Sequence, residues 1–166
     1  MLLELPTADE IDDMAARVPS LTVRRYEFDL LDHKIDLNYT PCKGEVMIVT
    51  RRDDGVVLVK SKGTVMWTLP AARIRMDEAP EDAARRVAKE RCGLDLTEAN
   101  LKALYDVTRH YQNVSVKRLF VVYGCSTEMD PDGSLAMSTD ECAVHFDDLD
   151  KLALEEIDAQ AIADCL

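Results

Sequence analysis

The residues with the clearest chemical potential in this chain lie between positions 72 and 94. Glu78 and Glu90 supply carboxylates there, and Arg86 and Arg91 supply guanidinium groups. Carboxylate oxygens are ligands for Mg²⁺, whereas arginine binds phosphate oxygens through two parallel hydrogen bonds. Side chains four residues apart on a helix, such as Arg86 and Glu90, also form ordinary ion pairs on a solvated surface. The segment is therefore either a metal or phosphate site or a charged helix face.

A strand, a loop and a helix must position these side chains. Pro80 suits the first turn of a helix, and Gly93 occupies the place where such a helix would end. Upstream, the strand-like segments 44–50 and 56–60 are joined through Asp-Gly, which predicts a hairpin. A short extended piece over residues 66–69 then leads to Pro70.

The remaining elements complete an α/β fold with a mixed sheet flanked by helices. A capping box predicts a helix from about residue 8 to 17, and alternation predicts a strand over 21–30 with a slip near Arg24 and Arg25. Apolar periodicity predicts these further elements: strands over 101–111, 114–125 and 141–146, and an amphipathic helix over 149–165.

Residues 72–94 resemble the Nudix box, which is written G-x5-E-x7-R-E-U-x-E-E-x-G-U with U aliphatic. The positions that match the box are Glu78, Arg86, Glu90, Gly93 and Leu94. The preceding hairpin and the Trp67–Pro70 segment are also similar to this family, so the resemblance covers about residues 43–150. It implies a Nudix-type α/β/α sandwich, with the Nudix domain over 41–166 and residues 1–40 forming a helix and strand extension packed on it.

The resemblance also implies an activity, and the chain departs from the pattern at the positions that the activity needs. Family members are usually hydrolases that cleave a phosphoanhydride in a nucleoside diphosphate linked to another group, with Mg²⁺ or Mn²⁺ held by glutamates. Here two of those glutamates are replaced by Val87 and Arg91, and the opening glycine pair is Ala71-Ala72. We therefore expect that the usual metal cluster does not form.

The resemblance assigns candidate roles to individual side chains. The expected catalytic residues are Glu90, Glu78, Arg86 and Glu141, of which Glu90, Glu78 and Glu141 could hold one weakly bound metal ion, with Asp77 or Asp140 as further carboxylates. The expected ligand-binding residues are Arg91, Lys60, Arg73, Arg75 and Arg109. Arg91 could replace the metal as a fixed cation that binds a pyrophosphate. Any one of the other basic residues could instead be an ordinary solvated side chain.

Two functional hypotheses follow, and the sequence leaves both open. The first is a metal-dependent pyrophosphohydrolase of weak or altered activity, with Mg²⁺ or Mn²⁺ as cofactor. The second is a non-catalytic nucleotide-binding or regulatory module that needs no metal. A third hypothesis, a protein-interaction domain using the acidic C-terminal segment, has less support.

Composition excludes several classes of protein. The formal net charge is −12, which argues against a protein that coats nucleic acid or an anionic membrane through its overall field. The charge is uneven, because residues 41–125 have 15 basic and 11 acidic residues while 126–166 have one basic and 12 acidic. Five cysteines without a Cys-x-x-Cys pair, and no signal-like start, predict a cytoplasmic protein. Residues 1–40 could supply an extra strand or the surface of a homodimer.

Overall fold

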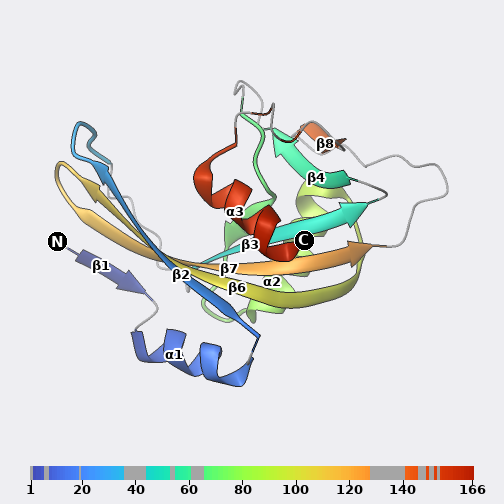
Figure 1. The fold of residues 1–166 in the computed structure, drawn as a ribbon, viewed down its shortest axis with the longest axis horizontal. Coiled ribbons are helices and arrows are strands. Elements are labelled where there is room, and N and C mark those ends of the chain that lie inside the picture. Colours follow the sequence, from blue (N-terminus) through green and yellow to red (C-terminus); the bar gives the residue numbers. More distant parts are fainter. Residues whose placement is uncertain are drawn as a thin grey trace.

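The computed structural model describes residues 2–5, 8–18, 20–35, 44–52, 55–60, 66–127, 141–145, 149, 152 and 154–166. Within these ranges the elements, shown in Figure 1, are β1 (Leu2–Leu5), α1 (Ala8–Arg17), β2 (Thr22–Leu30), β3 (Glu45–Arg52), β4 (Gly55–Lys60), β5 (Ala71–Arg73), α2 (Pro80–Cys92), β6 (Leu96–Tyr111), β7 (Ser115–Thr127), β8 (Glu141–His145) and α3 (Glu156–Cys165).

The strands form one mixed sheet in the order β2-β6-β7-β3-β4-β8. Strand β7 pairs antiparallel with β6 along one edge. Along its other edge β7 pairs in parallel with β1 and then with β3. Strand β2 is parallel to β6, so residues 22–30 are an additional strand of this sheet, and β5 pairs with the start of β3.

Two apolar layers cover opposite faces of the sheet, which gives the α/β/α sandwich expected from the sequence. One layer lies under α2, and it includes Val46, Ile48, Val121 and Val87. The other lies under α3, and it includes Met47, Val49, Val122, Ile157 and Ala161. Consecutive residues of β3 and β7 enter different layers because side chains alternate across a strand. Figure 1 shows α2 and α3 on the two sides of the sheet.

Local sequence signals explain the helix that follows β5. Pro80 lies at its first position, and Glu81 and Asp82 lie near the positive end of its dipole. Gly93 ends the helix with a φ of 67°, a conformation that costs a residue with a side chain extra energy. The predicted hairpin is also confirmed, since Arg52 of β3 pairs with Gly55 of β4.

Two predictions about the other elements are wrong. The expected slip near Arg24 and Arg25 is absent, because exposure alternates without a break along β2 and Arg24 occupies an inward position. The C-terminal helix begins at Glu156 rather than at residue 149. Leu152 and Leu154 still pack against the α3-side layer, so their apolar character reflects burial without helical backbone.

Arg24 is inward because it pairs with an aspartate from the far end of the sequence. Its Nε and Nη2 donate to the two carboxylate oxygens of Asp164 at 2.8 and 2.7 Å. The Tyr105 hydroxyl donates to the same carboxylate at 2.6 Å, and so does the Gln160 amide at 3.0 Å. These contacts, with Arg24 first, lower the pKa of Asp164 to about 2. The network ties β2 to α3 and to β6.

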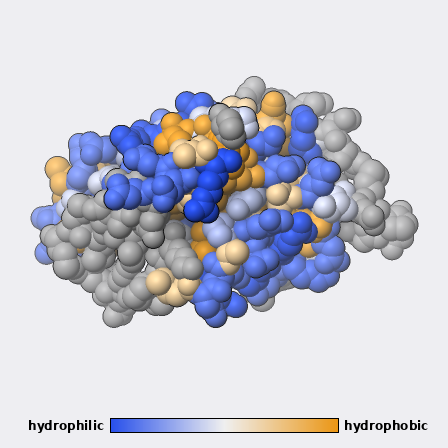
Figure 2. Space-filling view, turned by 90° about the horizontal axis from the view of Figure 1, so that it is seen from below, coloured by the Kyte–Doolittle hydropathy of each residue, from blue (hydrophilic) through white to orange (hydrophobic). Residues whose placement is uncertain are grey.

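The outside of the molecule agrees with the high charge of the sequence. Figure 2 shows one face that is largely hydrophilic, with hydrophobic residues in one central patch and at a few scattered positions. Among the described residues, no helix is both long enough and apolar enough to cross a membrane.

We expect Asp164→Asn to lower the free energy of unfolding by ~2 kcal/mol at pH 7, because Arg24 and Tyr105 lose a charged acceptor. For a chain of this size the midpoint of thermal unfolding should fall by about 4–8 °C. The pKa of Asp164 is lowered in the folded state, so its contribution is present above pH 4 and is lost as the pH falls towards 2. Thermal unfolding at pH 7 and pH 3 measures this, with the exposed Asp29→Asn as control. Equal destabilisation at both pH values would contradict it.

Candidate functional site

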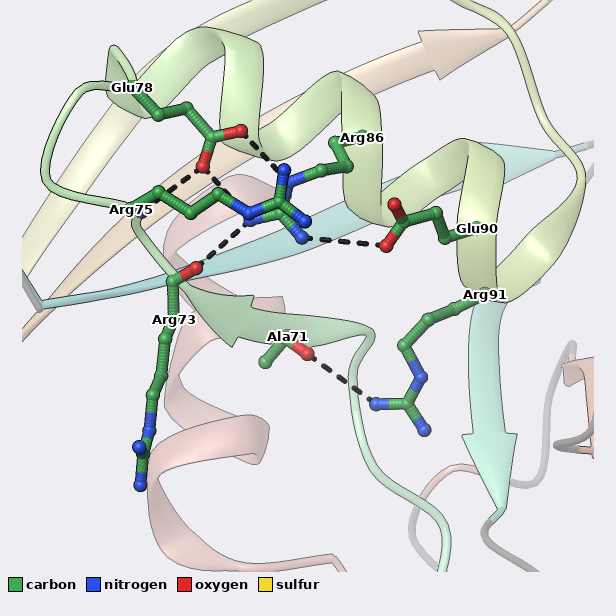
Figure 3. A network of polar contacts seen from close by, with 7 residues as sticks. All are labelled: Ala71, Arg73, Arg75, Glu78, Arg86, Glu90 and Arg91. Atoms are coloured by element: carbon green, nitrogen blue, oxygen red, sulfur yellow. Dashed lines mark hydrogen bonds and ion pairs between the residues drawn. The ribbon is translucent and has the colours of Figure 1, made fainter. Parts of the chain in front are cut away.

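The candidate site is built around an ion pair between Glu78 and Arg86. Arg86 of α2 donates from Nε to Glu78 Oε2 at 2.8 Å and from Nη2 to Oε1 at 2.9 Å. Glu78 lies in the loop before α2, and the two side chains are only 13% and 17% exposed. Paired, partly buried hydrogen bonds of this kind are strong and directional. The pair therefore fixes the loop to the helix (Figure 3).

Backbone groups of the loop join the same network. Arg86 Nη2 also donates to the carbonyl of Arg73 at 3.0 Å, which ties the end of β5 to α2. The backbone N–H of Arg75 donates to Glu78 Oε1 at 3.2 Å. With Arg86 as the largest cause, these contacts lower the pKa of Glu78 below its usual value. Glu78 is thus held ionised in a structural role.

The two positions where the Nudix pattern has glutamates are apolar and cationic here. Val87 has no exposed surface and is part of the α2-side core. Arg91 lies one helical turn further along α2, and its Nη1 donates to the carbonyl of Ala71 at 3.5 Å. Figure 3 shows the Arg91 side chain pointing towards β5, whereas Glu90 beside it points towards Arg86. A cation therefore lies at the start of β5.

These side chains do not fit the usual magnesium cluster of the Nudix pattern. Both oxygens of Glu78 are hydrogen-bonded within the protein, and Glu90, 58% exposed, lies 3.5 Å from Arg86. Within the described ranges, no group of three His, Cys, Asp or Glu residues could hold a metal ion. Glu141 is paired through its backbone with Lys60, but its side chain lies outside the described part of the chain, as do Asp140 and its backbone.

The remaining predicted ligand-binding residues are spread over both faces of the sheet. Arg73 is exposed, and its side chain points away from the Glu78–Arg86 pair in Figure 3; Arg75 is also exposed. Lys60 Nζ lies 5.7 Å from the centre of the Trp67 ring, and that ring packs on the α3-side layer. Arg109 stacks on Phe120 of the same layer, so the sheet separates it from α2.

Sequence reasoning missed Asp158 of α3, a buried carboxyl group beside the segment that leads into β5. Asp158 is 5% exposed, and its carboxylate accepts a hydrogen bond from the backbone N–H of Leu69. Burial, with Glu155 as a second cause, raises its pKa to about 7. A signal was present, because Asp158 lies three and four residues before the buried Ala161 and Ile162 on one helical stripe.

Comparison with known proteins decides the family. The sequence profile of the NUDIX domain matches residues 43–165, which is most of the chain. The chain belongs to the Nudix family. No protein with a curated description matches the sequence.

Solved structures agree with the Nudix fold at low sequence identity. A MutT protein from Bacillus halodurans has a TM-score of 0.60 and 13% identity, covering 72% of this chain and 78% of that chain. The NUDIX domain of Shewanella oneidensis NrtR, solved as a complex with ADP-ribose, has a TM-score of 0.59 and 16% identity, covering 78% and 90%. A NUDIX hydrolase from Nitrosomonas europaea has a TM-score of 0.53 and 22% identity, covering 72% and 85%.

We expect Asp158→Asn to stabilise this Nudix domain above pH 7, because the amide keeps an acceptor for Leu69 without a buried charge. The folded-state pKa of Asp158 is raised from 3.8 to about 7, so the wild-type chain loses stability as the pH rises from 4 to 7. At ~1.4 kcal/mol per pKa unit, the gain should reach a few kcal/mol at pH 8 and vanish near pH 4. Urea unfolding across this pH range measures it.

The exposed Asp95→Asn is the matched control and should change stability little at any pH. A gain for Asp158→Asn that is the same at pH 4 and pH 8 would contradict the raised pKa of this group.

Proposed function

We propose that this Nudix protein binds a nucleoside diphosphate-linked small molecule beside β5 and the loop that joins it to α2, with Arg91 as a fixed cation for the phosphates and with little or no hydrolysis. The observation behind the proposal is the pair of positions 87 and 91 on α2. The first is an alkyl group in the core, and the second is a guanidinium beside the carbonyl of Ala71.

The electrostatics of these positions favour an anion over a metal ion. Two unit charges 5 Å apart interact by roughly 3 kcal/mol at an effective dielectric constant of 20. Arg91 therefore repels a divalent cation where a glutamate would attract it, and it attracts a diphosphate by a comparable amount. A guanidinium also matches two phosphate oxygens through its planar fork of N–H donors.

The rest of the loop supports binding by keeping its shape without a metal. Glu78 and Arg86 link the loop to α2, and the backbones of Arg73 and Arg75 join this link. A loop held in advance loses less entropy when a ligand binds. The NrtR domain that resembles this fold was solved with ADP-ribose, which supports a ligand of the same class here.

A second candidate function is a hydrolase of reduced activity that uses Mg²⁺ or Mn²⁺. The observation that favours it is the exposed Glu90, which could hold one ion together with Glu141 or with Glu78 after a rearrangement. With Glu78 as the second ligand, the site needs that carboxylate to exchange Arg86 for the metal. We therefore rank it below binding without turnover.

Calorimetric titration with ADP-ribose in the presence of a chelator tests the binding proposal. We expect binding without metal that is weakened at least tenfold by Arg91→Glu, because an attractive charge near the phosphates becomes repulsive. Lys89→Glu makes the same charge change at an exposed site on the same helix turn and should leave affinity nearly unchanged. Equal effects of the two variants would contradict a specific role for Arg91.

A hydrolysis assay with Mg²⁺ or Mn²⁺ distinguishes the second candidate. Rapid turnover of ADP-ribose that Glu90→Gln abolishes would overturn the proposal of binding alone. Restoring both glutamates is a poor test, because Val87→Glu would place a carboxylate at a fully buried position and should unfold the domain.

A further inference from the structure

A serine, a histidine and a glutamate lie together near the turn between β6 and β7, outside the Nudix box at residues 72–94. The Nδ1 atom of His110, near the end of β6, lies 2.7 Å from the Oγ atom of Ser115, the first residue of β7. The Oε1 atom of Glu27 in β2 lies 3.7 Å from the other ring nitrogen of His110, Nε2. Three strands thus place a hydroxyl, an imidazole and a carboxylate side by side, in that order.

This order suits the transfer of a proton from Ser115 to His110. A serine hydroxyl is a weak nucleophile until a neighbouring base takes its proton, and 2.7 Å is within the range over which a base can do so. Glu27 favours the imidazole tautomer that has its proton on Nε2, and in this tautomer Nδ1 accepts a hydrogen bond from the serine hydroxyl. The carboxylate also stabilises the imidazolium that forms after proton transfer. The group therefore contains a nucleophile, a base and a carboxylate that orients the base.

The same face of the sheet is accessible and carries further polar groups. The side chains of His110 and Glu27 are 32% and 78% exposed, and Ser115 is partly exposed. Thr108 and Lys117 lie opposite each other across β6 and β7. Because side chains alternate along a strand, both share a face with the imidazole and the serine. A hydroxyl and an ammonium group can stabilise the negative oxygen that develops when a nucleophile attacks a carbonyl group.

We propose that Ser115 is a nucleophile and that this face of the sheet hydrolyses esters of small carboxylic acids. Ser115 Oγ forms a bond to the ester carbonyl carbon while its proton moves to His110 Nδ1. The ester C–O bond then breaks, and the alcohol leaves with that proton. A water molecule gives a proton to His110 and attacks the acyl-serine, the bond to Oγ breaks, Ser115 regains the proton, and the carboxylic acid is released.

The chemistry of the group sets the class of substrate. Because the three side chains project from the surface of a sheet, only the acyl group and the leaving oxygen need to reach them. An ester with a short acyl chain and a good leaving group meets this condition. The inference concerns the end of the β6–β7 hairpin and does not depend on phosphate binding near Arg91.

Labelling of the full chain with a fluorophosphonate tests whether Ser115 is activated. In this reaction the serine oxygen displaces fluoride from phosphorus, and the serine proton passes to the imidazole. We expect peptide mass spectrometry to find the phosphonyl group on Ser115 and not on Ser126, an exposed serine of the same strand. His110→Gln should slow the labelling of Ser115 roughly a hundredfold, and Ser126→Ala should leave it unchanged. The result for the unaltered chain needs no variant, so it holds even if His110→Gln fails to fold.

Release of p-nitrophenol from p-nitrophenyl acetate tests turnover. Ser115→Ala should abolish the enzymatic rate, whereas Ser115→Cys supplies another nucleophile beside His110 and should still be acylated. Glu27→Gln changes an exposed side chain, so it should lower the acylation rate at saturating ester about threefold without moving the midpoint of thermal unfolding.

Several outcomes would overturn the proposal: no adduct on Ser115, equal labelling of Ser126, labelling that survives His110→Gln in a folded variant, or an acyl-serine that water does not hydrolyse. Arg91→Glu should keep the esterase activity even if it loses ADP-ribose binding. Failure of one proposal is therefore distinguishable from failure of the other.

Discussion

Strand β7 must bury both of its faces, and this constraint places most of the other elements. Leu119, Val121 and Tyr123 enter the layer under α2, whereas Phe120 and Val122 enter the layer under α3. The edges of β7 are also occupied, by β6 on one side and by β1 and β3 on the other. Because a shift of one residue would exchange the two faces, the register of β7 fixes where the helices can lie.

The α2 loop shows how a Nudix box can keep its shape while its chemistry changes. Glu78 and Arg86 form two hydrogen bonds with each other and so hold the loop against α2. No metal ion is needed to link the loop to the helix. Position 87 can then hold an apolar side chain, and Val87 is fully buried in the core. Arg91 places a positive charge near β5, on the side where relatives would place a negative one. Structure and reactivity are therefore separable within this one helix.

Local patterns predicted the elements that local chemistry determines. The start and end of α2 follow from Pro80 and Gly93. The Nudix box indicated Glu78 and Arg86 as site residues, but their contact with each other was not predicted. Features set by distant partners could not be predicted in this way. The inward position of Arg24 depends on a carboxylate 140 residues away, and the helical stripe that indicates burial of Asp158 does not identify its partner, the backbone of Leu69. The sites that lack a local signal are those where two distant segments meet.

The ion pair between Arg24 and Asp164 also affects the order in which the chain can fold during synthesis. Strand β2 leaves the ribosome early, yet its strand partner β6 and its ionic partner on α3 are made much later. Until then its alternating apolar residues have nothing to pack against. Final assembly of this layer must therefore wait for the last residues of α3. A chaperone or the ribosome surface would meet β2 as an unpaired strand for most of translation.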